Sequence, residues 1–156
     1  MKDERINLCF PGGENILLAD GNSIDLDSLF TEFQNPTHDE FYTWSLVDGD
    51  KFVKNKIKDI YLLGNTWDII NLNLTDGTRI RCTLNQQIKL KTGEFVGASE
   101  FPMDKPMLRK DGKDTTILSK TQTNLKEVEN VYLIELEDDY ENLTLSDGIV
   151  VKSIRA

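Results

Sequence analysis

The sequence contains one histidine, His38, and two cysteines, Cys9 and Cys82, among its 156 residues. One histidine and two distant cysteines make neither a zinc-binding pattern nor a disulfide framework. The sequence also has no glycine-rich phosphate loop and no Gly-x-Ser-x-Gly nucleophile elbow. We therefore expect no metal site and no bound cofactor.

Basic residues are few: 18 Lys and Arg stand against 27 Asp and Glu, which gives a net charge of −9 at pH 7. Because nucleic-acid binding depends on clustered Lys and Arg, this balance argues against a nucleic-acid partner. No apolar run approaches the length of a membrane span, and the charged start of the chain is unlike a secretory signal. We expect a cytoplasmic location or a place in an intracellular assembly or virion, with protein partners and no membrane contact.

Helical periodicity is nearly absent, and short apolar or alternating segments between turn residues take its place. We expect strands at 16–19, 41–47, 51–63, 67–74, 79–83, 87–91, 94–96, 116–119, 128–136 and 148–151. The segment 23–30 begins with alternation typical of a strand and then closes as a short helical turn. No sequence repeat is visible and no linker divides the chain, so the pattern predicts one all-β domain.

The segment 9–13 places a cysteine beside a proline and two glycines. Pro11 fixes its own φ angle, and glycine reaches backbone conformations closed to other residues, so a sulfur atom is set next to a tight turn. Taken alone, Cys9 is best interpreted as a small buried residue before a turn, which is the usual role of a free cysteine.

Three segments, taken in order, resemble the Hint fold of inteins and hedgehog autoprocessing domains. They are Cys9 with Pro11-Gly12-Gly13, then 76–86 followed by 93–101, and finally 131–138 followed by 146–151. The resemblance spans nearly the whole chain, at the length of a minimal intein without an endonuclease. It implies a horseshoe of short antiparallel strands with pseudo-two-fold symmetry over residues 9–153, between an N-terminal flank (1–8) and a C-terminal flank (154–156).

The resemblance also implies a chemistry. In the family a first cysteine attacks the preceding carbonyl to form a thioester, and a histidine in a Thr-x-x-His segment protonates the leaving amide. An aspartate and a penultimate histidine assist later steps, and a terminal asparagine cyclises. Cys9, Thr83 and Asn85 match this pattern. Four positions depart from it: Gln86 replaces the first histidine, Leu133 the aspartate, Lys152 the penultimate histidine and Ser153 the asparagine.

Glutamine cannot supply a proton at neutral pH, and serine cannot form a succinimide. We therefore expect a splicing-inactive Hint-fold domain that is not an enzyme and acts as a structural or protein-interaction module, in a larger, phage-like assembly. The alternative is a residual self-cleaving domain in which Cys9 forms a thioester at the Leu8–Cys9 bond, without C-terminal cleavage or splicing. His38 lies in a polar loop outside every motif.

Overall fold

The computed structural model describes residues 9–48, 51–64, 68–122 and 129–153. Both predicted flanks, 1–8 and 154–156, lie outside the described residues. The elements are β1 (Phe10–Pro11), β2 (Asn15–Leu17), β3 (Ser23–Asp25), α1 (Leu26–Phe33), β4 (Tyr42–Val47), β5 (Lys51–Gly64), β6 (Ile69–Leu74), β7 (Arg79–Thr83), β8 (Gln87–Lys89), β9 (Phe95–Gly97), η2 (Ala98–Glu100), β10 (Ile117–Gln122), β11 (Val131–Leu136), β12 (Asn142–Thr144) and β13 (Val150–Lys152).

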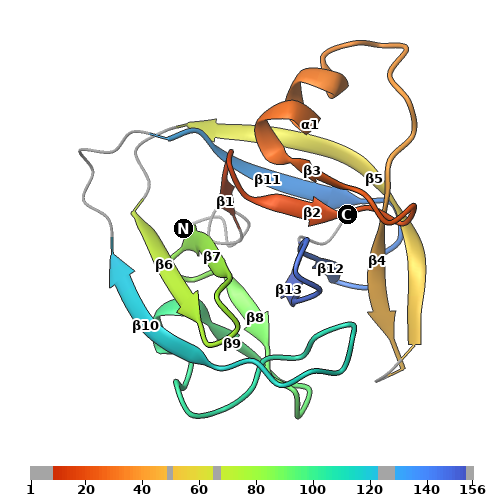
Figure 1. Ribbon diagram of the computed structural model, residues 1–156. Helices are drawn as coiled ribbons and strands as arrows, with labels where there is room; N and C mark the ends of the chain where they lie inside the picture. The colour runs from red at the N-terminus through yellow and green to blue at the C-terminus, as the bar shows by residue number, and fades with distance from the viewer. Residues whose placement is uncertain (1–8, 49–50, 65–67, 123–128, 154–156) are drawn as a thin grey trace.

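The strands form curled antiparallel sheets that together make a horseshoe (Figure 1). The long strand β5 pairs with β4 along one edge and with β11 along the other, and β1 completes this sheet beside β11. In the second sheet β6 lies between β7 and β10, and in the third β13 lies between β12 and β8, with β9 outermost. A separate hairpin joins β2 and β3. The all-β prediction is confirmed.

The strand predicted at 128–136 begins at Val131 in the structure, and its first predicted position lies outside the described residues. Its first four side chains, Val131 to Ile134, are all buried, so the strand does not alternate between core and solvent. The reason is its position: β11 lies between β1 and β5 within its sheet, and its faces are covered by other elements. On β5, by contrast, the side chains of Lys51, Lys54 and Lys58 are exposed, so this strand keeps one face toward solvent.

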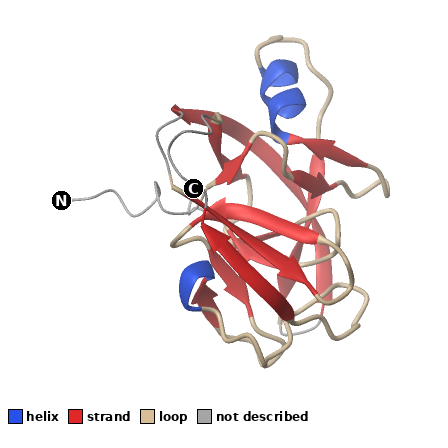
Figure 2. Cartoon of the chain, turned by 60° about the vertical axis from the view of Figure 1, so that its left-hand side comes forward, coloured by secondary structure: helices blue, strands red, loops and turns tan. Residues whose placement is uncertain are grey.

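The predicted helical turn is a two-turn helix, α1. Its N-cap is Asp25, whose carboxylate accepts hydrogen bonds from the Ser28 backbone N–H (3.0 Å) and hydroxyl (2.7 Å). Leu26 and Leu29 are buried and attach the helix to the core. The hairpin β2–β3 runs directly into α1, and the hairpin β8–β9 runs directly into η2, the two helical segments of Figure 2.

These two hairpin-and-helix units repeat one backbone pattern, displaced by 72 residues along the chain. The matching hydrogen bonds are Glu14 N–H to Pro11 O and Gln86 N–H to Thr83 O; Leu18 N–H to Asn22 O and Leu90 N–H to Glu94 O; Gly21 N–H to Leu18 O and Gly93 N–H to Leu90 O; Leu26 N–H to Glu14 O and Ala98 N–H to Gln86 O. This repeat is the pseudo-two-fold symmetry that the resemblance implied. It relates Glu14 to Gln86 and Cys9 to Arg81.

Most buried apolar side chains form one core between the sheets, and a smaller cluster of Cys9, Ile69 and Val131 lies beside it. Within the described residues, no helix is long and apolar enough to cross a membrane.

Candidate functional site

Cys9 directly precedes β1 and is fully buried. Its side chain packs in the small cluster with Ile69 and Val131, against the partly buried Leu63. The next strand positions, Phe10 and Pro11, pair with β11, so the cysteine is held at the edge of the first sheet. Cys9 therefore lies in an apolar surrounding, at the edge strand of the first sheet.

The turn after Cys9 is held against the start of α1. The Asp27 N–H donates to Gly12 O (3.1 Å), and the Gly12 N–H donates to Asn130 O (2.9 Å). A Cβ atom at Gly12 would overlap the Asp27 carboxylate, which itself accepts a hydrogen bond from the Tyr132 hydroxyl (2.6 Å). Glycine is therefore favoured here by a close approach, at an ordinary backbone angle, because a larger residue would displace the Asp27 carboxylate.

Thr83 is the link between Cys9 and the second half of the chain. Both its backbone N–H (3.1 Å) and its hydroxyl (3.4 Å) donate to Cys9 O. Thr83 ends β7 and is buried, and its own carbonyl accepts from the Gln86 N–H (3.1 Å). The structure thus brings Cys9, Thr83 and Gln86 into one hydrogen-bonded series. Asn85, the third residue that matched the family pattern, is exposed.

Gln86 links this series to the last strand. Its side chain is fully buried, and Nε2 donates both to Lys152 O (2.9 Å) and to Gln87 O (3.0 Å). We name these two hydrogen bonds, with the backbone contact from Gln86 to Thr83, the Gln86 clasp. The clasp joins segments that are 66 residues apart in the chain.

The other predicted site positions lie wholly or partly outside the hydrogen-bonded series of Cys9, Thr83 and Gln86. Ser153 is buried, and its N–H donates to Glu141 O (3.0 Å). Lys152 offers its carbonyl to the clasp, but its ammonium lies 5.9 Å from the centre of the Phe95 ring. Leu133 lies in the middle of β11, paired with Tyr61 of β5.

His38 lies in the connection between α1 and β4. Its ring stacks on Phe33 with a centroid distance of 4.2 Å, and Nδ1 lies 2.6 Å from Asp39 O. These contacts place the imidazole among the aromatic side chains beside α1, as a packing residue of that connection.

Glu14 is a residue that the sequence did not single out. Its Oε2 accepts a hydrogen bond from the Arg81 N–H (2.8 Å), and burial raises the pKa of its carboxyl to about 7. Burial likewise raises the pKa of the Cys82 thiol well above its usual range, and the nearby Glu14 adds to that effect. No sequence pattern marks Glu14, because the repeat in which it corresponds to Gln86 lies in the backbone hydrogen bonds.

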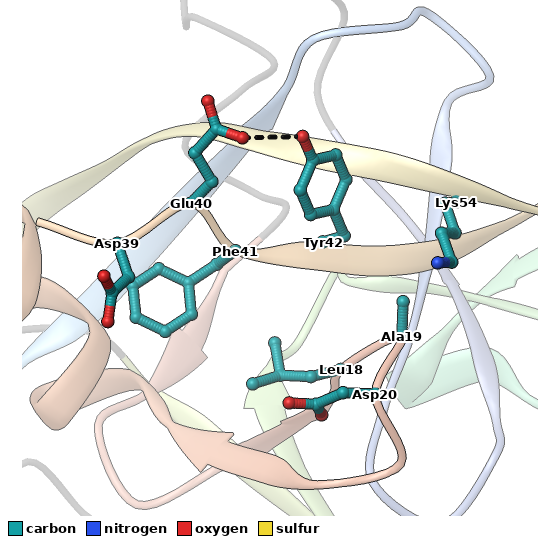
Figure 3. A pocket seen from close by; sticks show the side chains of 8 residues that line it. All are labelled: Leu18, Ala19, Asp20, Asp39, Glu40, Phe41, Tyr42 and Lys54. Atoms are coloured by element: carbon teal, nitrogen blue, oxygen red, sulfur yellow. Dashed lines mark hydrogen bonds between the residues drawn. The ribbon is translucent and has the colours of Figure 1, made fainter.

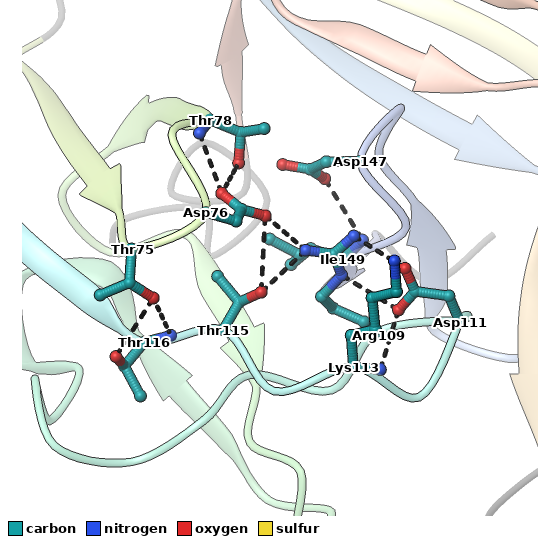
Figure 4. A network of polar contacts seen from close by, with 10 residues as sticks. All are labelled: Thr75, Asp76, Thr78, Arg109, Asp111, Lys113, Thr115, Thr116, Asp147 and Ile149. Carbon is teal, nitrogen blue, oxygen red and sulfur yellow. Dashed lines mark hydrogen bonds and ion pairs between the residues drawn. The ribbon is translucent and has the colours of Figure 1, made fainter.

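Arg109 fixes the loop that precedes β13 (Figure 4). Its guanidinium pairs with Asp76 and Asp111 and donates to the Thr115 hydroxyl (2.8 Å). Its backbone forms a β-bridge with Ile149. This network belongs to the scaffold that positions β13.

A pocket of about 300 Å³ lies away from Cys9, between the β2–β3 turn and the start of β4 (Figure 3). Its wall includes a hydrogen bond from the Tyr42 hydroxyl to Glu40 (2.8 Å). It is lined by Leu18, Ala19, Asp20, Asp39, Glu40, Phe41, Tyr42 and Lys54. Among the described residues, no group of three or more His, Cys, Asp or Glu side chains is arranged to hold a metal ion.

No family model matches the sequence, and no curated protein sequence matches it either. Solved structures do match. The DnaB intein from Synechocystis sp. PCC 6803 superposes with a TM-score of 0.76 at 21% identity, covering 94% of this chain and 99% of that one. The bacterial intein-like domain from Clostridium thermocellum superposes with a TM-score of 0.76 at 17% identity, again covering 94% and 99%. This chain therefore has the Hint fold of the inteins.

Proposed function

We propose that this chain is a splicing-inactive Hint-fold domain that serves as a structural or protein-interaction module. The observation that carries the proposal is the Gln86 clasp. The family resemblance assigns a proton-donating histidine to this position, whereas the side chain here is a buried neutral amide. An amide donates hydrogen bonds but does not release a proton near neutral pH, so the leaving amide of a thioester-forming step would receive none from it.

The clasp also supports the structural part of the proposal. Both N–H groups of the Gln86 amide are engaged by backbone carbonyls, one of them in β13. A hydrogen bond of this kind contributes about 1 kcal/mol, and leaving the buried partner unpaired costs more. Gln86 therefore holds β13 against β8, and Thr83, which bonds Gln86, holds the same segment against Cys9.

At the other end of the site, Ser153 supports the absence of C-terminal cleavage by asparagine cyclisation. Its side chain has one hydroxyl and no amide nitrogen, so no succinimide forms from it. A domain that performs neither thioester formation nor asparagine cyclisation leaves the segments on both sides covalently attached. We extend the proposal to a component of a larger, phage-like assembly with protein partners.

The competing candidate is thioester formation at the Leu8–Cys9 bond. It is favoured by the two hydrogen bonds that Thr83 donates to Cys9 O, which hold the backbone of the cysteine in one place. In that case the Cys9 thiol attacks the Leu8 carbonyl, the Leu8–Cys9 amide becomes a thioester, and an external thiol releases the segment before Cys9.

Intact-mass measurement separates the two candidates. The purified chain is incubated with and without a strong thiol at several pH values, together with Cys9→Ala and the matched control Cys82→Ala, a second fully buried cysteine. The proposal expects one unchanged mass for all three proteins. Thiol-dependent loss of residues 1–8 from the parent chain and from Cys82→Ala, but not from Cys9→Ala, would establish the self-cleaving alternative.

A further inference from the structure

Two half-buried lysines, Lys89 of β8 and Lys152 of β13, have no oxygen partner within the described part of the chain. The described residues include six half-buried basic side chains, and each of the other four binds a carboxylate or a backbone carbonyl. Their pairs are Lys56 with Glu40, Arg81 with Glu129, Arg109 with Asp76, and Lys120 with the carbonyls of Ser99 and Phe101. Lys89 and Lys152 are therefore the exceptions to a pattern that the rest of the described chain follows.

Both of these ammonium groups lie over one aromatic ring. The distance to the centre of the Phe95 ring is 4.4 Å from Lys89 Nζ and 5.9 Å from Lys152 Nζ. Lys89 and Phe95 are direct cross-strand partners in β8 and β9. Ile88 pairs with Val151, and because side chains alternate along a strand, the lysines that follow these two residues share the opposite face. We name the side chains of Lys89, Phe95 and Lys152 the Phe95 face.

The ring compensates the two positive charges only in part. An aromatic face attracts a cation, but it brings no negative charge to neutralise it. Burial lowers the pKa of Lys89, and Glu94, which attracts this ammonium, is exposed and accepts a hydrogen bond from the Thr92 hydroxyl. The two ammonium groups also repel each other. A carboxylate placed between them would offset both the burial and the repulsion.

The Phe95 face borders a free edge of its sheet. The strand order is β12–β13–β8–β9, so the outer edge of β9 pairs with no other strand among the described residues. The backbone N–H and C=O groups of such an edge can pair with an extended peptide. A small anion uses only the two charges, whereas a peptide that carries a carboxylate uses the charges and the edge together.

From these observations we propose that the Phe95 face binds an extended acidic segment of a protein partner, with a Glu or Asp carboxylate between Lys89 and Lys152. This inference rests on the proposed function and gives the interaction module a partner of defined chemistry. The chain as a whole has a net charge of −9 and repels such a segment, so the attraction is local and selects one face. The exposed lysines of β5 are solvated by water and gain less from a carboxylate.

Fluorescence anisotropy of a labelled peptide tests the proposal on the full chain. The probe is Thr-Glu-Val-Glu-Val-Glu-Thr, whose glutamates share one face when the peptide is extended. The matched control peptide, Thr-Gln-Val-Gln-Val-Gln-Thr, has the same length and no side-chain charge. We expect the chain to bind the glutamate peptide and not the glutamine peptide. Inorganic phosphate at the concentration of the peptide should not displace it, because phosphate cannot pair with the β9 edge.

Variants of the two lysines assign the site. Lys89→Gln and Lys152→Gln should each weaken binding of the glutamate peptide by about 3- to 5-fold, and the double variant by about 10-fold. Lys89→Arg keeps the charge and should keep the affinity. Lys58→Gln removes the same charge from an exposed position on β5 and should have no effect. The Gln86 clasp is unchanged in Lys152→Gln, because Gln86 binds the backbone carbonyl of residue 152.

Three results would overturn the proposal: no binding of the glutamate peptide, equal binding of both peptides, or unchanged affinity in the double variant. Displacement by an equal concentration of phosphate would identify a simple anion site and overturn the assignment to a peptide. The splicing-inactive part of the proposed function fails differently, through a thiol-dependent fragment that begins at Cys9. Intact mass of the same sample therefore shows which of the two inferences has failed.

Discussion

Replacing Glu14 with glutamine should remove a pH-dependent loss of stability. Burial raises the pKa of this carboxyl from its ordinary value of 4.5 to about 7. Between pH 4.5 and pH 7, the carboxyl is therefore protonated in the folded chain and ionised in the unfolded chain. The stabilisation is therefore fully present below pH 4.5 and is lost as the pH rises through 7. The difference between the two pKa values corresponds to about 3 kcal/mol of unfolding free energy.

The other groups around Glu14 do not reverse the direction of this pKa shift. The Arg81 N–H donates to the Glu14 carboxylate and Arg81 attracts it, which lowers the pKa, while the half-buried Asp147 raises it. Burial also raises the pKa of Asp147, so that residue adds a loss of stability in the same direction. Glutamine at position 14 retains an oxygen that can accept from the Arg81 N–H without taking a buried charge.

The assay is urea unfolding, followed by tryptophan fluorescence, at pH 5, 6, 7 and 8. We expect Glu14→Gln to be close to the parent chain in stability at pH 5 and more stable by up to about 3 kcal/mol at pH 8. Glu32→Gln, which changes an exposed carboxylate on α1, is the matched control and should follow the parent within about 0.5 kcal/mol. Parallel curves for Glu14→Gln and the parent from pH 5 to pH 8 would refute the assignment of this titration to Glu14.

Three further changes test the scaffold of the site. Gly12→Ala should lower the free energy of unfolding by about 1–2 kcal/mol, because the Asp27 carboxylate must turn away from the Tyr132 hydroxyl. In a double-mutant cycle, Gly12→Ala should cost much less when Asp27 is already alanine, and additive costs would contradict the overlap. Arg109→Met should lower the free energy of unfolding in chemical denaturation by about 1 kcal/mol, since Asp76 and Asp111 lose the cation with which they pair, and high salt should narrow the difference between variant and parent. Gln86→Leu should cost about 2 kcal/mol in thermal unfolding and should increase hydrogen exchange at β13; unchanged exchange there would argue against the Gln86 clasp.

Local turn chemistry explains why the hairpins could be predicted from the sequence. Gly21 and Gly93 adopt positive φ angles of 93° and 111°, and each closes a short turn between apolar strand residues. Such signals lie within a few neighbouring residues. They require no knowledge of which distant strand will pair, and the structure has turns at 19–21 and 91–93, directly beside the predicted strands 16–19 and 87–91.

Long-range burial explains what the sequence could not provide. Asn142 is a polar residue in a segment without strand character, yet it lies in β12 and is buried. Its side chain accepts from the Leu46 N–H (2.6 Å) and donates to Leu46 O (3.0 Å), replacing the hydrogen bonds that a neighbouring strand would make. Hydrogen bonds to a residue 96 positions away leave no signal in the local sequence pattern.

The family resemblance located the site, but the internal repeat explains its construction. At related positions of the two halves, Glu14 accepts from the backbone N–H of Arg81, and Gln86 donates to the backbone carbonyl of Lys152. The shared feature is a side chain that reaches across to another strand, and the two residue types use opposite hydrogen-bonding roles. A search for sequence identity overlooks this relation because only the backbone geometry and a few apolar and glycine positions repeat.

The same comparison clarifies why glutamine suits position 86. A neutral imidazole has one N–H donor, whereas the glutamine amide has two, and here both are used, on Gln87 O and Lys152 O. Histidine would satisfy both carbonyls only as a buried cation, at a desolvation cost that the amide avoids. Glutamine therefore makes the stronger clasp at neutral pH and the weaker proton donor, so at this position the hydrogen bonds that hold β13 compete with the proton transfer that cleavage would need.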